Sequence, residues 1–183
     1  MSPVVFLDRD GVINRARTDH VKSWPEFQFL PRALEALAEL HRSGARLVVI
    51  TNQSAVGRGL LGQHELTSIH EKMLRMVQAA RGHIDGIYVC PHTIEIGCAC
   101  RKPGNELFKR AGADLGLELR GAYMVGDSWT DVQAALSIDA MPILVSQDPS
   151  RMVTDSLVPV VHDLYEAAAL VLAASRKPEP ARR

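Results

Sequence analysis

The sequence predicts a single α/β domain built on a Rossmann-like parallel sheet with helices on both faces. Short apolar runs that end at polar residues alternate with stretches in which apolar residues recur at helical spacing. The 183 residues are enough for one substantial core, and they contain neither an internal repeat nor a second core. We therefore expect one domain over residues 1–175, with residues 176–183 as a disordered tail.

The predicted elements follow one another in strand–helix order. Strands are expected at 4–7, 46–50, 87–89, 122–125 and 143–145. Helices are expected from Pro31, over 64–81, over 104–115, from Trp129, and from an Asp163 cap to Ala174. The stretch 14–29 has no clean period, so we expect a loop or small hairpin there, lying over the strand ends.

Composition and charge exclude several classes of protein. Lys plus Arg and Asp plus Glu each number 21, so no global field favours nucleic acid or an anionic membrane. The apolar stretch 167–174 is too short to cross a bilayer, and no secretory signal is expected before a core that begins at Val4. We expect a cytoplasmic monomer that binds neither nucleic acid nor a membrane.

The first predicted strand ends in two carboxylates. Asp8 and Asp10 follow the apolar run 4–7 and point the same way along an extended chain, whereas Arg9 is expected to point opposite. Gly11 then lets the backbone leave at a sharp angle. Two like charges at the carboxyl end of a buried parallel strand favour a hard cation such as Mg²⁺. The alternative is a solvated turn after an edge strand.

Polar groups also follow the other predicted strands. In chain order, the groups are Asp8 with Asp10, Thr51 with Asn52, Arg101 with Lys102, and Asp127. Because the carboxyl ends of parallel strands meet at one rim of a sheet, we expect these groups to converge there. Their co-location predicts a ligand site more specifically than any one of them does.

A short loop holds all three cysteines of the chain. Cys90, His92, Cys98 and Cys100 offer three thiols and one imidazole within residues 90–100. Three sulfurs and one nitrogen complete a tetrahedral structural Zn²⁺ site with no open position. The alternative is a buried cluster of free cysteines, which leaves the thiols of this loop unexplained. The surface is expected to hold four other histidines: His64, His70, His83 and His162.

These motifs together resemble those of the haloacid dehalogenase-like phosphohydrolases. Asp8-x-Asp10-Gly11-Val12 is similar to their first motif, Thr51 to the second, Lys102 to the third, and Gly126-Asp127 followed by Asp131 to the fourth. The resemblance covers residues 4–148 and implies a Rossmann-like core in which the first strand is central. It implies a support role for Asp131, either toward Lys102 or toward metal-bound water.

The resemblance implies a Mg²⁺-dependent phosphate monoester hydrolase. Asp8 would be the nucleophile that forms an aspartyl-phosphate, and Asp10 would be the general acid and then the general base. Thr51 and Lys102 would stabilise the transferring phosphoryl group. The implied Mg²⁺ ligands are Asp8, the Asp10 backbone carbonyl and Asp127.

The zinc loop resembles that of a subfamily containing heptose 1,7-bisphosphate 7-phosphatases and histidinol-phosphate phosphatases. The segments 7–14 and 51–59 are more similar to the heptose enzymes. The implied substrate-binding residues are Asn52, Gln53, Ser54, Arg101 and Arg58, the last for a distal phosphate. The expected reaction removes the 7-phosphate of D-glycero-D-manno-heptose 1,7-bisphosphate. The alternatives are histidinol-phosphate hydrolysis and a non-catalytic phosphometabolite-binding protein.

The spacing of the motifs leaves no room for a large cap domain. No long insertion follows the first motif, and too few residues separate Thr51 from Lys102. We therefore expect an open site, closed only by a short loop and the small zinc-binding loop. Such a site suits a small phosphorylated metabolite, which is the partner that the resemblance implies.

Overall fold

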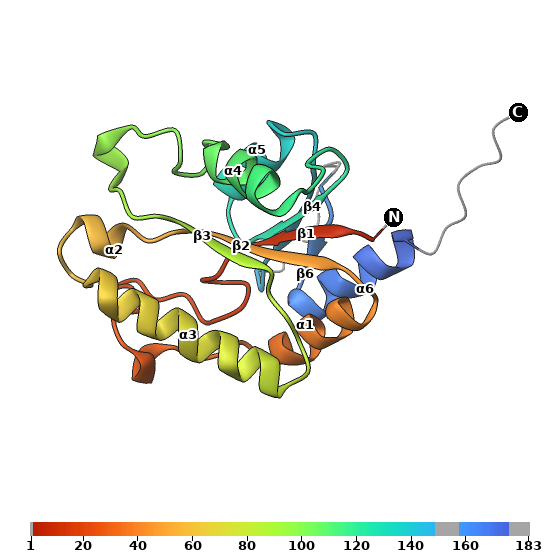
Figure 1. Cartoon of the computed structure of the whole chain (residues 1–183), viewed down its shortest axis with the longest axis horizontal. Helices are drawn as coiled ribbons and strands as arrows, with labels where there is room; N and C mark the ends of the chain where they lie inside the picture. The colour runs from red at the N-terminus through yellow and green to blue at the C-terminus, as the bar shows by residue number, and fades with distance from the viewer. Residues whose placement is uncertain (1, 149–157, 176–183) are drawn as a thin grey trace, which may run out of the picture.

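The sheet of this protein has six strands, each pairing parallel with its neighbours (Figure 1). The computed structural model describes residues 2–148 and 158–175. The strand order is β3-β2-β1-β4-β5-β6, which places the first strand in the interior of the sheet. The strands are β1 (Val4–Leu7), β2 (Arg46–Asn52), β3 (Gly86–Cys90), β4 (Tyr123–Gly126), β5 (Met141–Val145) and β6 (Val160–Val161).

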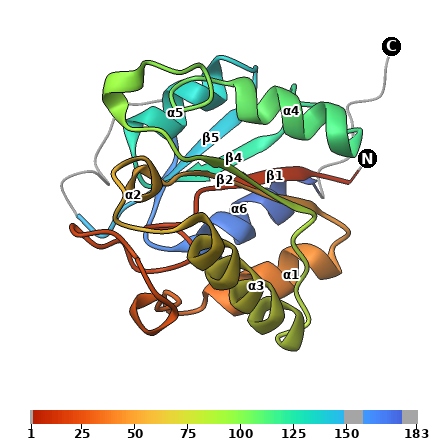
Figure 2. The same ribbon diagram turned by 60° about the vertical axis from the view of Figure 1, so that its left-hand side comes forward.

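Helices cover both faces of the sheet, as the sequence predicts. One face carries α1 (Ala33–Arg42), α3 (Gln63–Ala79) and α6 (Leu164–Ser175). The opposite face carries α4 (Glu106–Leu115) and α5 (Trp129–Leu136), which lie above the sheet in Figure 1 and Figure 2. Residues 2–148 also form three short helical turns: η1 (Trp24–Glu26), α2 (Ser54–Gly57) and η2 (Ile94–Ile96).

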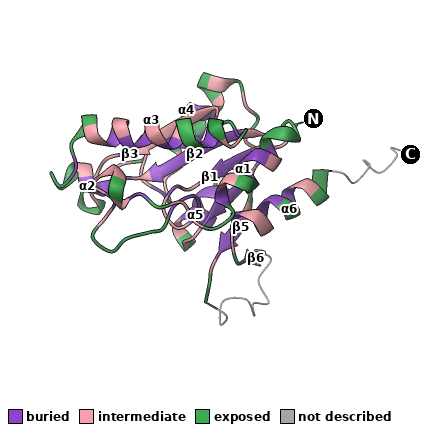
Figure 3. Cartoon of the chain, turned by 90° about the horizontal axis from the view of Figure 1, so that it is seen from below, coloured by how far each residue is buried: buried purple, intermediate pink, exposed green. Residues whose placement is uncertain are grey.

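Strand alternation divides the core into two layers. Val5 and Leu7 pack under α1, α3 and α6, whereas Phe6 faces α4 and meets Phe108 edge to face at 5.1 Å. All three of these β1 side chains are fully buried, and Figure 3 shows the central strands as the most continuously buried part of the fold. A strand buried on both faces carries no polar side chain until it ends, so its first polar residues emerge at the rim.

Several boundaries differ from the sequence-based expectation. Strand β2 continues to Asn52, beyond the predicted end at residue 50, and the short helix α2 begins at Ser54. Strand β6 is not among the predicted strands, because two valines are too short a run to show a period. The predicted tail, 176–183, lies outside the described residues.

The segments above the rim are short. Residues 8–32 form a loop whose ends are joined by a bridge between Asn14 and Phe29, and Arg15 N donates to the Gln28 carbonyl at 2.8 Å. The zinc loop lies between β3 and α4. Within the described ranges the sheet therefore has no large cap domain. No helix in those ranges is long and apolar enough to cross a membrane.

Candidate active site

Lys102 contacts residues from three elements at the rim of the sheet. Its Nζ lies 3.0 Å from Asp8 Oδ1, directly after β1, and 2.7 Å from Asp131 Oδ1 in the first turn of α5. It also donates to the Ile50 carbonyl of β2 at 2.7 Å. The Lys102 side chain is 1% exposed, so its position is fixed by packing as well as by charge. The rim thus brings together residues from distant parts of the chain.

Three carboxylates gather around this lysine. Oxygens of Asp8, Asp127 and Asp131 all lie within 4.8 Å of one another. Burial, reinforced by neighbouring carboxylates, raises the pKa of Asp8 to about 7, although Lys102 opposes the shift. Burial and the nearby Asp131 similarly raise the pKa of Asp127 to about 6. One lysine leaves this cluster short of positive charge, so the donor set fits a hard divalent cation.

Gly11 makes room for one of those carboxylates. Its φ is +82°, and a Cβ at this position would overlap the carboxylate of Asp127. A residue with a side chain would therefore both strain the backbone and push Asp127 away from Asp8. A glycine is thus required after the two acids, because Asp127, at the end of β4, approaches the Gly11 backbone closely.

Asp131 uses both of its oxygens inside the protein. Oδ2 accepts hydrogen bonds from the backbone and hydroxyl of Ser128, at 3.1 and 2.6 Å, in a capping box at the start of α5. Oδ1 faces Lys102. Gly126 permits this packing, because a Cβ there would overlap the Asp131 side chain. The arrangement favours a supporting role for Asp131 over direct metal binding.

The Asp10 carboxylate lies apart from the cluster and is held by three donors. Asn14 Nδ2 approaches it at 2.8 Å, Gln53 Nε2 at 2.7 Å and Arg9 Nη2 at 2.9 Å. Its side chain is 28% exposed, so it still reaches solvent at the rim. A carboxylate that is fixed in direction yet accessible suits proton transfer.

Two residues of this site contradict the sequence-based expectation. Arg9 does not point away from the acids: its fully buried guanidinium folds back onto Asp10, because strand alternation fixes Cβ and leaves the rest of a long side chain free to turn. His70 is not at the surface but buried on α3, where its Nε2 lies 3.0 Å from Arg9 Nη1. The helical spacing of Leu66, His70 and Met73 indicates this buried face.

The environment of His70 predicts an acid-labile fold. Burial, with the Arg9 charge beside it and Asp10 opposing, lowers the pKa of His70 to about 4 from 6.5. A lowered histidine pKa means that the unfolded chain takes up a proton first as pH falls, so stability decreases between pH 6.5 and 4. We expect His70→Gln to remove up to about 3 kcal/mol of this loss. Urea unfolding at a series of pH values measures the free energy of unfolding, with the exposed His83→Gln as the control. If this free energy fell equally steeply with pH in the parent and in His70→Gln, His70 would not be the cause of the acid lability.

The side chains of Asn52 and Gln53, two of the predicted substrate-binding residues, form hydrogen bonds within the protein. Asn52 holds the backbone of Lys102 reciprocally, accepting from its N–H at 3.1 Å and donating to its carbonyl at 3.2 Å. Gln53 is buried between Asp10 and Thr51. Ser54 is also buried, at the first position of α2. Asn52 and Gln53 therefore organise the rim from beneath.

The two predicted arginines lie at separate hollows. Arg101 lines a cavity of about 320 Å³ with Lys102 and Thr130, and its Nη1 donates to the His92 carbonyl at 3.2 Å. Arg58 is exposed and lines a hollow of about 540 Å³ with residues of the loop 18–22. A substrate with two phosphates offers a partner for each arginine.

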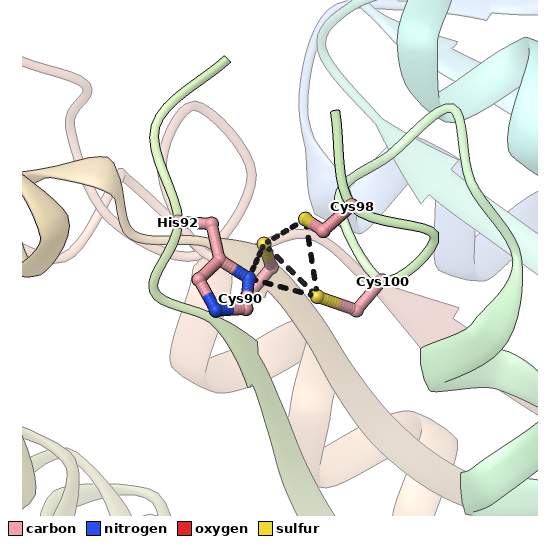
Figure 4. A group of neighbouring side chains, drawn as sticks. All are labelled: Cys90, His92, Cys98 and Cys100. Atoms are coloured by element: carbon pink, nitrogen blue, oxygen red, sulfur yellow. Dashed lines mark hydrogen bonds between the residues drawn. The ribbon is translucent and has the colours of Figure 1, made fainter. Parts of the chain in front are cut away.

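The four predicted zinc ligands converge (Figure 4). The sulfurs of Cys90, Cys98 and Cys100 lie 3.3 to 3.6 Å apart, and His92 Nδ1 lies 3.3 Å from the Cys100 sulfur and 3.7 Å from that of Cys90. Zn–S bonds of about 2.3 Å in a tetrahedron separate sulfurs by about 3.8 Å, so the cluster fits Zn²⁺ after a small expansion. No fifth donor is needed, as expected of a structural site.

The zinc loop is packed against the rim. The Gly57 N–H donates to the Pro91 carbonyl at 2.9 Å, and a Cβ on this glycine would lie only 2.7 Å from that oxygen. The last ligand, Cys100, immediately precedes Arg101 and Lys102. Metal binding in this loop therefore positions the lysine that contacts Asp8.

Loss of zinc is expected to weaken both the fold and the site. We expect about one equivalent of Zn²⁺ per chain, and a Cys98→Ser variant whose Tm falls by at least about 5 °C, because binding energy at a structural site is folding energy. Elemental analysis and thermal unfolding in saturating Mg²⁺ measure both quantities. Metal-free protein with an unchanged Tm would show that the cluster is not a structural zinc site.

Comparisons with known proteins agree with this geometry. A family described as HAD-hydrolase-like matches residues 99–167. The chain belongs to the haloacid dehalogenase-like hydrolases. Within them it is similar to D-glycero-beta-D-manno-heptose-1,7-bisphosphate 7-phosphatase of Pseudomonas aeruginosa, with 37% identity over 78% of this chain and 80% of the relative. The enzyme of the same name from Bordetella bronchiseptica is 39% identical over 81% of this chain and 83% of its own length.

Solved structures lead to the same family. The crystal structure of D,D-heptose 1,7-bisphosphate phosphatase from B. bronchiseptica, complexed with magnesium and phosphate, superposes with a TM-score of 0.86. It is 35% identical and covers 94% of this chain and 99% of its own. The corresponding enzyme of Burkholderia thailandensis has a TM-score of 0.68 at 32% identity, over 93% of this chain and 99% of its own.

Proposed function

We propose that this protein is a Mg²⁺-dependent phosphatase that removes the 7-phosphate of D-glycero-D-manno-heptose 1,7-bisphosphate through an aspartyl-phosphate on Asp8. One observation carries the proposal: the Asp8 carboxylate, 3.0 Å from a buried lysine, belongs to a cluster of three carboxylates at the end of the sheet. The substrate in this proposal is inferred from the relatives that are named for this activity.

The substrate phosphate and the Asp8 carboxylate are both anions, so their repulsion must be reduced before they can react. Asp8, the Asp10 backbone carbonyl and Asp127 are the residues that would hold Mg²⁺, which when bound neutralises charge between Asp8 and the phosphate. Lys102 adds a second cation on the side of Asp8 and Asp131. Asp8 is then ionised and can attack phosphorus.

Asp10 supplies the proton chemistry. It protonates the departing sugar oxygen while Asp8 forms its bond to phosphorus, and it then takes a proton from the water that hydrolyses the aspartyl-phosphate. Its carboxylate is fixed by three donors and still reaches solvent, which supports both steps. The buried Thr51 hydroxyl donates to the phosphoryl oxygens, and Asn52 holds the Lys102 backbone in place.

The distal phosphate requires a cation outside the catalytic cluster. Arg101 is the candidate beside Lys102, and Arg58 lines the separate hollow next to the loop 18–22. Both contribute, after the Thr93 hydrogen bond, to lowering the pKa of Glu95, so their charges reach the same part of the loop. We further propose that the protein is cytoplasmic, because a reducing compartment keeps the three thiols of the zinc loop available. We also propose that it is a monomer.

The deciding experiment offers two substrates side by side. Purified protein with Mg²⁺ is given heptose 1,7-bisphosphate and histidinol phosphate, and kcat/KM is measured for each. We expect the heptose bisphosphate to be preferred, with release of the 7-phosphate alone. A higher kcat/KM for histidinol phosphate would overturn the assignment of the substrate, and no hydrolysis of either would overturn the proposed reaction.

A further inference from the structure

Arg9 is a fully buried cation with three partners beneath the rim. Its Nη1 lies 3.0 Å from His70 Nε2. Its Nη2 lies 2.9 Å from Asp10 Oδ2 and 3.0 Å from Gln53 Oε1. The guanidinium also faces the Phe27 ring, 5.9 Å from its centroid. A buried guanidinium must keep its hydrogen-bond partners, because losing one leaves its charge uncompensated. Arg9 therefore holds the side chains that it contacts in fixed positions.

The chemistry of arginine sets the direction of these hydrogen bonds. A guanidinium only donates, so each of its three partners accepts. His70 therefore presents the lone pair of Nε2 and carries its proton on Nδ1; burial, together with the Arg9 charge, keeps this ring neutral at pH 7 by lowering its pKa to about 4. Gln53 turns its carbonyl oxygen toward Arg9, and its amino group must then face the other way.

That amino group has two acceptors, one for each hydrogen. Gln53 Nε2 lies 2.7 Å from Asp10 Oδ2 and 2.9 Å from Thr51 Oγ1. Thr51 thus receives a hydrogen bond from beneath, which leaves its own hydroxyl proton free to point outward. The fixed polarity of one amide aims both the carboxylate of Asp10 and the hydroxyl of Thr51.

We propose that Arg9 and His70 are positioning residues for the proton-transfer step, acting through Gln53 on the acid Asp10. This inference rests on the proposed phosphatase function. Neither residue touches the substrate; His70 holds Arg9 from α3, and Arg9 sets the Gln53 amide and the Asp10 carboxylate. The helix α3 is thereby connected to the proton-transfer step.

The test removes or replaces the His70 acceptor. His70→Leu leaves Nη1 unpaired, His70→Gln restores an acceptor at similar reach, and His70→Asn is too short to do so. Met73→Leu, on the same buried face of α3, is the control for repacking. First-turnover rates are measured in Mg²⁺ with an alkyl phosphate, whose alkoxide needs a proton, and with p-nitrophenyl phosphate, whose phenolate leaves without one.

We expect His70→Leu to lower the alkyl-phosphate rate by about 10- to 100-fold, with KM within about two-fold. Its p-nitrophenolate burst should stay within about three-fold of the parent, and His70→Gln should recover most of the alkyl-phosphate rate. If His70→Leu does not fold, His70→Asn takes its place against His70→Gln. Equal losses on both substrates, or no loss while the parent turns over, would overturn this inference; a parent inactive on both would instead overturn the phosphatase function.

Discussion

Replacing Asp8 with asparagine should abolish phosphatase turnover while leaving the fold intact. The amide keeps the shape of the carboxylate but cannot attack phosphorus, so we expect kcat to fall by at least about 10⁴-fold. Substrate and Mg²⁺ should still bind, because Lys102 and Asp127 remain. Initial rates at saturating Mg²⁺ measure the loss. The exposed Asp139→Asn, in the connection between α5 and β5, is the matched control and should keep the parent rate.

The same variant should change stability in a direction set by burial. The pKa of Asp8 is raised to about 7, so the native state holds its proton longer than the unfolded chain does. Stability without Mg²⁺ therefore falls as pH rises from about 4 to 7, and the asparagine removes that fall. We expect metal-free Asp8→Asn to be more stable than the parent at pH 8. A variant that is both inactive and less stable at pH 8 would contradict this account of the acidic cluster.

Replacing Lys102 with methionine should be nearly as damaging, for two separate reasons. It removes the cation that we propose to accompany the phosphoryl group, which we expect to lower kcat by about 10³-fold. It also leaves the buried Asp131 without its ion-pair partner, which costs about 3–5 kcal/mol of folding free energy. Chemical denaturation and initial rates separate the two effects.

A surface lysine provides the control for this change. Lys109→Met lies on the exposed side of α4, so both its rate and its stability should match those of the parent. A Lys102→Met protein with parental kcat would show that the lysine does not take part in phosphoryl transfer. Unchanged stability would show that its contacts with Asp8 and Asp131 are not important for folding.

The sequence predicts the sheet well because its inner strands are buried on both faces. Continuous apolar runs that end at polar residues locate β1 to β5 and also place Asp8, Lys102 and Asp127 at one rim. The zinc ligands are predictable for a related reason, since their chemistry requires nearby residues of particular types. Strand β6 contains two residues, too few for any period to be detected.

The network beneath the rim could not be predicted in the same way. Strand alternation gives the direction of the Arg9 Cβ, but the guanidinium lies several rotatable bonds further on and turns toward Asp10. His70 could be assigned to the buried face of α3 by its spacing, yet its partner is 61 residues away. Gln53 and Asn52 fit a rim that binds substrate, and only their contacts reveal that they hold Asp10 and Lys102.

Chemical trapping of the phosphorylated residue tests the central claim most directly. Protein mixed with Mg²⁺ and substrate is quenched with borohydride, which reduces an aspartyl-phosphate to homoserine, and the peptides are analysed by mass spectrometry. The account predicts homoserine at position 8, and none there in Asp8→Asn or in the absence of substrate. Trapping at another carboxylate, or rapid turnover with position 8 unmodified, would contradict it.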